Sequence, residues 1–119
     1  MKPTIKIKRV YDAPAAGDGK RILVDRLWPR GIAKADAKID FWAKGISPSN
    51  DLRKWYNHDP EKWEEFRDRY FAELDANPDS VRELLEQLDT HTVTFLFSSK
   101  ESRINNAVAL KDFVGARLK

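Results

Sequence analysis

Two arginines and a tryptophan lie close together just after an apolar run, and their side chains suit the binding of a flat or anionic ligand. Residues 22–24 form an uninterrupted apolar triplet, which is typical of a strand buried on both faces. Arg26, Trp28 and Arg30 follow within six positions. A guanidinium group presents a planar fork of donors that matches carboxylate and phosphate groups, and an indole offers a flat face. These three residues are therefore candidates for ligand binding.

The same side chains also have a structural interpretation. An arginine beside a core strand often pairs with a carboxylate, here Asp25 or Asp40, and a tryptophan near a sheet end is often part of the core. Asp25 could act as a general base if it were partly desolvated. Pairing with Arg26 or Arg30 would keep it ionised, so we expect Asp25 to act as a structural clamp.

A second candidate site lies further along the chain, where Ser98, Ser99 and Lys100 end a strand and precede a helix. Their hydroxyl groups and nearby backbone amides could cradle an oxyanion, and the lysine would add positive charge. Helix capping and loop chemistry explain the two serines equally well.

Histidine and cysteine offer little further chemistry. His58 is the one plausible acid-base imidazole, but its place just before a helix also suits packing or hydrogen bonding. His91 has the setting of a loop residue. The chain has no cysteine, and two separated histidines without cysteine are poor metal ligands. We therefore predict no metal and no cofactor, and we assign no catalytic residue.

The charge of the chain is unevenly distributed. Residues 1–38 hold ten Lys and Arg against four Asp, which gives +6, whereas the whole chain has a net charge of +3. This asymmetry favours an anionic partner near the first third, although a solvated surface has the same appearance. The chain has no apolar run near transmembrane length, and its amino terminus leads into a Lys-alternating strand. We therefore expect no membrane contact and a cytoplasmic location.

The elements that must position these side chains can be predicted from the hydrophobic pattern. Residues 4–10 alternate apolar and basic, so they predict a strand with Lys6 and Lys8 on its wetter face. Residues 92–98 are β-branched and aromatic, which predicts a central strand. Together with the strand that contains residues 22–24, these form a sheet of about three strands.

Five helical segments are predicted between and after the strands. Residues 33–41 give two weak turns, and residues 51–56 give a short helix capped by a Ser or Asn of the preceding turn. Asp59 and Pro60 open the clearest helix, whose apolar stripe runs to a stop at residues 77–78. Residues 79–88 form a further helix with Ser80 as its cap, and residues 103–118 form the last.

This order predicts one α/β domain over residues 1–119, with a small, parallel or mixed sheet flanked by helices in a Rossmann-like arrangement. In a parallel sheet, residues 11–12, 25–30 and 98–100 would meet at the carboxyl edge, where ligands bind in open α/β sheets. The loop over residues 11–20 is short for a parallel crossover. An antiparallel hairpin of the first two strands is therefore the alternative.

Several short stretches carry a resemblance to a known family, namely residues 9–12, 21–31, 52–55, 58–60, 63, 66–70, 106–108 and 110–111. On these stretches the chain resembles the YeaO-like family of small bacterial proteins, a branch of a larger group of domains of unknown function. The resemblance covers nearly the whole chain. It implies a parallel α/β fold with motifs at the strand ends, and it implies no established activity.

One stretch departs from that family. Its members carry an acidic run followed by His just after the last strand, and more distant relatives have cysteines near this strand. Here the stretch runs from Lys100 to Asn106, with Ile104 in place of the imidazole. The resemblance therefore implies no mechanism that depends on that His or on a Cys.

Our functional prediction is the binding of a small anionic or phosphorylated ligand at the carboxyl edge of the sheet. The binding residues would be Arg26, Trp28, Arg30 and the turn of Ser98, Ser99 and Lys100, and the sequence leaves open whether catalysis follows binding. The alternative is a nucleic-acid-binding or protein-interaction module that uses the basic, Trp-containing first third. The sequence gives no oligomeric state.

Overall fold

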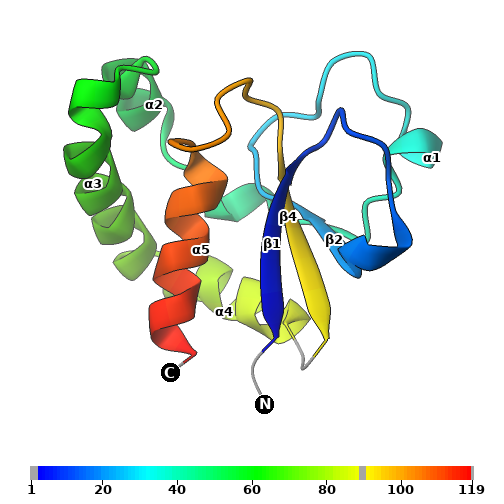
Figure 1. The fold of residues 1–119 in the computed structure, drawn as a ribbon. Coiled ribbons are helices and arrows are strands. Elements are labelled where there is room, and N and C mark those ends of the chain that lie inside the picture. The colour runs from blue at the N-terminus through cyan, green and yellow to red at the C-terminus, as the bar shows by residue number, and fades with distance from the viewer. Residues whose placement is uncertain (1–2, 89–90, 119) are drawn as a thin grey trace.

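The computed structural model describes residues 3–88 and 91–118, and it is built on one parallel β-sheet (Figure 1). The strands are β1 (Thr4–Arg9), β2 (Lys20–Leu23), β3 (Phe41–Trp42) and β4 (Thr92–Phe97). Their order across the sheet is β1-β4-β2-β3, and each neighbouring pair is parallel. The predicted α/β class with a parallel sheet is therefore confirmed.

The position of β4 rules out the hairpin alternative. β4 lies between β1 and β2, so the first two strands are not neighbours. The short loop after β1 includes the 3-10 helix η1 (Ala16–Asp18). It carries the chain past the position of β4 to β2, so β2 does not lie directly beside β1. The antiparallel hairpin was wrong because the last strand of the chain occupies the place that the hairpin would need.

The segment before β3 differs from the predicted helix over residues 33–41. Only Lys34–Ala37 form the one-turn helix α1, and Lys38 ends it with a left-handed backbone at φ 50°. Phe41 and Trp42 then pair with the outer edge of β2, through Asp40 N to Arg21 O and Ala43 N to Leu23 O, each at 2.8 Å. Two aromatic residues are too few to give an alternating pattern, so the sequence predicted three strands where the structure has four.

The remaining helices are α2 (Asn50–Tyr56), α3 (Trp63–Asp75), α4 (Pro78–Gln87) and α5 (Asn106–Arg117), with the 3-10 turns η2 (Lys44–Ile46) and η3 (Pro60–Lys62). Ser49 caps α2, because its side chain accepts from Leu52 N, and Asp59 caps η3, which leads directly into α3. Ser80 is not a cap, since α4 already begins at Pro78. Within the described residues, no helix is long and apolar enough to cross a bilayer.

The two faces of the sheet are covered differently. Figure 1 shows α3, α4 and α5 on one side of the sheet and α1 on the other. The helical side holds the main core, to which β4 contributes Val93, Phe95 and Phe97. On the opposite side, Leu23 and Leu96 pack under Trp28 of the loop that follows β2 and under Trp42 of β3. A long loop therefore serves as the second layer, and its first residues lie where β2 ends.

A buried charged cluster fastens η1 to the sheet. Asp18 accepts from Lys8 at 3.1 Å and pairs with Arg21, and its backbone oxygen accepts from Thr94 Oγ1 at 2.7 Å. Burial acts to raise the pKa of Asp18, but hydrogen bonds from the Ala15 backbone, Lys8 and Arg21 outweigh it, so the pKa is lowered. Asp18 is thus an ionised tie between β1, η1, β2 and β4.

Candidate functional site

A cavity of about 650 Å³ opens where the carboxyl ends of β1, β2 and β4 meet. Its walls come from the loop after β2, from the turn after β4, and from α2 with the residues that follow it. This is the edge at which open parallel sheets bind ligands. Its size falls within the usual range for small-molecule sites.

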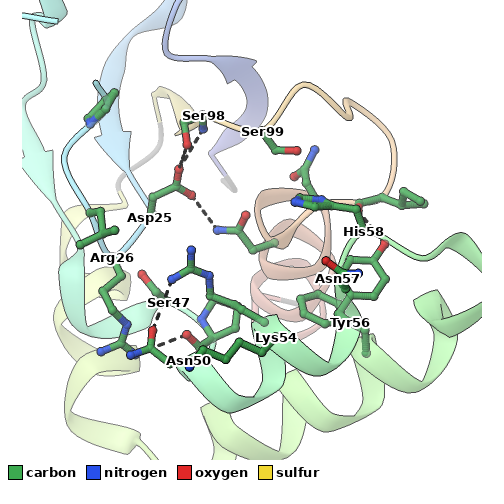
Figure 2. Close-up of a pocket in the computed structure, with 18 of the residues that line it drawn as sticks. Asp25, Arg26, Ser47, Asn50, Lys54, Tyr56, Asn57, His58, Ser98 and Ser99 are labelled. Carbon is green, nitrogen blue, oxygen red and sulfur yellow. Dashed lines mark hydrogen bonds between the residues drawn. The ribbon is translucent and has the colours of Figure 1, made fainter. Parts of the chain in front are cut away.

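Asp25 closes one wall of the cavity by tying three elements together (Figure 2). One carboxylate oxygen accepts from Ser98 N and Ser98 Oγ, both at 2.8 Å, and the other accepts from Asn106 Nδ2 at 3.0 Å. β2, β4 and α5 thus meet at one side chain. The prediction of a structural clamp fits this geometry, but the expected arginine partner is wrong, because the donors are a serine and an asparagine.

The two predicted arginines both line the cavity. Arg26 Nη2 donates to Pro48 O at 3.3 Å, and its buried Nε has no partner among the described residues. Arg30 is exposed, and its backbone oxygen accepts from Tyr11 Oη at 3.0 Å. Asp40, the other expected carboxylate partner, accepts instead from Arg21 N. Neither guanidinium is therefore tied up by an acid.

The short helix α2 adds two further cations, Arg53 and Lys54, that our sequence-based site did not include. α2 is held in place by Ser49, whose backbone N and Oγ donate to the two carboxylate oxygens of Glu73 at 2.8 and 2.6 Å. Arg53 Nη1 lies 3.4 Å from Asn50 Oδ1. Leu52 and Tyr56 are buried four positions apart on α2, and this apolar spacing leaves Arg53 and Lys54 exposed but does not place them at a cavity.

The charges of the cavity are unbalanced. Asp25 is the one acid among its lining residues, whereas Arg26, Arg30, Arg53 and Lys54 also line it. Over residues 3–88 and 91–118, none of these four cations forms an ion pair with a carboxylate. Elsewhere, arginines are paired with acids, as in Arg21, Arg67, Arg69, Arg82 and Arg117. An unpaired group of cations around a cavity attracts anions.

A second side of the cavity is aromatic and apolar. The Tyr56 ring stacks on Phe66 with centroids 4.3 Å apart, and Tyr56 Oη donates to Ile104 O at 2.9 Å. Burial, together with the charges of Glu101 and Asp59, raises the pKa of Tyr56, which keeps this phenol protonated. The His58 ring lies 6.4 Å from Tyr56 and also lines the cavity. His58 therefore faces a potential ligand, where the sequence favoured a packing role.

The other predicted site residues are divided between scaffold and cavity. Trp28 Nε1 donates to Ile32 O at 2.7 Å, and its ring meets Trp42 edge to face at 5.5 Å, so the indole is largely a packing residue that also borders the cavity. Ser98 and Ser99 line the cavity, and Ser98 is committed to Asp25. Lys100 is exposed and lies outside the lining.

Nothing in the described part of the chain forms a group of three or more His, Asp or Glu side chains placed to hold a metal ion. The chemistry that the cavity offers is therefore that of cations, amides and aromatic rings. Asn57 and Asn106 supply the amides, and Asn106 is partly used by Asp25.

The fold and the cavity together define a parallel α/β protein with a basic pocket at the carboxyl edge of its sheet. The family model described as the inactive DUF488-N3 subclade matches residues 4–119, so the chain belongs to that family of domains of unknown function. It is 42% identical over 110 residues to the uncharacterized protein YeaO of Escherichia coli (strain K12), covering 92% of this chain and 96% of that protein. The resemblance to the YeaO-like family is confirmed.

A more distant relative shows that the similarity extends along the whole chain. The uncharacterized protein Rv3073c of Mycobacterium tuberculosis (strain H37Rv) is 35% identical over 113 residues, which cover 95% of each chain. No solved structure shows a significant match. Ile104 lies in the cavity wall.

Proposed function

We propose that this protein binds a small phosphorylated or otherwise anionic ligand in the cavity at the carboxyl edge of its sheet. One observation carries the proposal: Arg26, Arg30, Arg53 and Lys54 line one cavity without an ion pair to any described carboxylate. The one acid there, Asp25, already accepts three hydrogen bonds. Phosphate and carboxylate groups are the natural partners of such a cluster, because they accept several charge-assisted hydrogen bonds at once.

The proposed role is binding and not covalent catalysis. The family description speaks of an inactive subclade. In this chain the cavity presents Ile104 where the YeaO-like pattern has an imidazole, and the sequence contains no cysteine. Ser98, one of three serines that line the cavity, donates a hydrogen bond from its hydroxyl to Asp25, which also accepts from the Ser98 backbone and Asn106. A cavity with this lining is suited to hold an anion and has no activated nucleophile.

The test is to measure binding of inorganic phosphate and ribose 5-phosphate by calorimetry to the full chain and to Arg30→Ala and Arg53→Ala. Each substitution removes one charge-assisted contact and should weaken ribose 5-phosphate binding about tenfold or more. Each should change the free energy of unfolding by less than about 0.5 kcal/mol, because both side chains are exposed.

Arg82→Ala is the matched control. Arg82 is an exposed arginine on α4 that pairs with Asp79 outside the cavity, so its removal should leave binding unchanged. Equal losses in Arg82→Ala and Arg30→Ala would mean that the anion is held by overall charge. Unchanged affinity in both cavity variants would assign the arginines to the scaffold.

The same titrations test the alternative of nucleic-acid binding. A short oligonucleotide that bound through the basic residues would lose affinity steeply between 50 and 200 mM salt. A ligand held inside the cavity should show a much shallower dependence, since it neutralises only a few cations. A steep slope together with unchanged affinity in Arg53→Ala would favour an open nucleic-acid surface over the cavity.

A further inference from the structure

We propose that the ligand is a nucleoside monophosphate, with its phosphate among the arginines and its planar heterocycle against the aromatic side of the cavity. This inference rests on the proposed anion binding and adds the chemical class of the ligand. It is carried by the division of the cavity into two unlike sides and by the Asn57 and His58 side chains that line the second side.

The two sides of the cavity differ in chemistry. Figure 2 shows Arg26 and Asn50 at one side of the pocket, with Asn57 and His58 at the other. Arg53 accompanies the first side, because its Nη1 lies 3.4 Å from Asn50 Oδ1, and Figure 2 shows Lys54 beside Asn50. A phosphate group needs only the first side, and a cavity of about 650 Å³ has room for a larger molecule.

The second side suits a flat ring. Tyr56, stacked on Phe66, and Ile104 give it an apolar wall, and the His58 ring stands 6.4 Å from Tyr56. Flat heterocycles stack on aromatic and imidazole rings and press against aliphatic side chains. A sugar phosphate or a simple acid would leave this wall in contact with water. The wall therefore favours a ligand that carries an aromatic ring beside its phosphate.

The edges of a heterocycle also need polar partners, and Asn57 can provide them. An asparagine side chain offers both a donor and an acceptor, which matches the mixed edge of a nucleobase. Asn57 is exposed at the cavity, and its side-chain amide makes no hydrogen bond to any residue in the described ranges. Its amide is thus available to a ligand.

Asn57 and His58 are the middle residues of a tight turn between α2 and η3, which Asp59 N closes by donating to Tyr56 O at 3.0 Å. Asn57 has φ 45° as the C-cap of α2, a position where the left-handed conformation is common. His58 follows with φ 56°, a second left-handed residue in succession, although its side chain is exposed. Asparagine and histidine are among the non-glycine residues that adopt this conformation most often. The turn places the exposed His58 side chain at the cavity, where a ligand ring can contact it.

The experiment compares adenosine 5′-monophosphate, ribose 5-phosphate and adenosine on the full chain and on His58→Gly by calorimetry. We expect adenosine 5′-monophosphate to bind about tenfold more tightly than ribose 5-phosphate, since stacking a base contributes this much. His58→Gly should remove most of that difference and leave ribose 5-phosphate binding unchanged. The thermal midpoint of His58→Gly should equal or exceed that of the parent, because glycine relieves the left-handed strain.

Lys38→Gly is the matched control, because Lys38 has the same left-handed backbone at φ 50° but ends α1 on the other face of the sheet. It should leave all three affinities unchanged. If ribose 5-phosphate binds as tightly as adenosine 5′-monophosphate, the proposed contact with a heterocycle is wrong and the proposal of anion binding stands. If adenosine alone binds, the anion proposal is wrong. If nothing binds, both are wrong, and equal losses of both phosphates in His58→Gly would place His58 at the phosphate side.

Discussion

The carboxylate of Asp25 connects the ends of two strands with the start of α5, and it does so with no help from an arginine. Its three donors are Ser98 N, Ser98 Oγ and Asn106 Nδ2. A carboxylate that accepts three hydrogen bonds at the rim of a cavity shapes the cavity and is not free to act as a base. Arg26 and Arg30 are therefore not the hydrogen-bond partners of Asp25.

Asp25→Asn should therefore lower stability. An amide keeps one acceptor but turns its NH2 group toward either the two Ser98 donors or the Asn106 donor, so we expect a loss of about 2 kcal/mol in the free energy of unfolding. Urea denaturation would measure it. Asp12→Asn is the control, because Asp12 is exposed and its carboxylate accepts from no residue of the described chain. If Asp25→Asn retained full stability but lost ligand binding, Asp25 would be a ligand contact.

At the residue level, two of the four cations that line the cavity were among the residues predicted from the sequence. Arg26 and Arg30 could be predicted because they follow a recognisable buried strand. Arg53 and Lys54 could not, since their place depends on the contact of Ser49 with Glu73, 24 residues away. The partner of Asp25 was missed for the same reason, because Ser98 and Asn106 are distant in sequence. Contacts of this kind follow from strand order, which no local pattern encodes.

At the level of elements, the loop over η1 is fastened by Asp18, and this contact should be sensitive to acid. The pKa of Asp18 is lowered in the folded protein, so its stabilisation is complete above the unfolded pKa of about 4 and is lost as the pH falls through the folded value. Asp18→Asn should cost about 3 kcal/mol at pH 7, and the cost should shrink below pH 4. Urea denaturation at pH 7, 5 and 3.5 would show this. An equal cost at all three pH values would contradict the ionised tie.

Two glycines with positive φ allow the effect of close packing on stability to be distinguished from the effect of backbone strain. A Cβ on Gly19, at φ 64°, would lie 2.0 Å from Thr92 O of β4, whereas a Cβ on Gly31, at φ 78°, would meet nothing within 4 Å. Gly31→Ala should cost about 1 kcal/mol, from strain alone. Gly19→Ala should cost more than about 3 kcal/mol, because the added Cβ would push the start of β2 away from β4. The two midpoints in urea would test this, and similar losses would contradict the close approach.

Elements with long, regular patterns were predictable and short ones were not. β1, β4 and the apolar stripe of α3 follow the periods of strand and helix, and the structure confirms them. β3 has two residues and α1 has one turn, so neither shows a period. The start of α4 was misplaced because Pro78 begins the helix without any side-chain cap, and Ser80 resembled one.

Across the whole molecule, several of the basic residues in the first third belong to the scaffold. Lys8 and Arg21 pair with Asp18, Lys20 donates to Gln87 O, and Arg9 donates to Ser99 O. The +6 of residues 1–38 is therefore no direct sign of an extended anionic partner. Arg26 and Arg30 of this part of the chain line the cavity together with residues of α2, whereas Lys34 and Lys38 are exposed outside the cavity.

The place of β4 also governs the order in which the chain can fold. Both β1 and β2 pair with β4, and Thr4 finds its partner only at Thr92. Until residues 92–97 leave the ribosome, β1 has no neighbour, and β2 can pair only with the two residues of β3. Such pairing across nearly the whole chain slows folding and leaves early strands exposed. The lysines that alternate along β1 discourage this waiting strand from pairing with other chains.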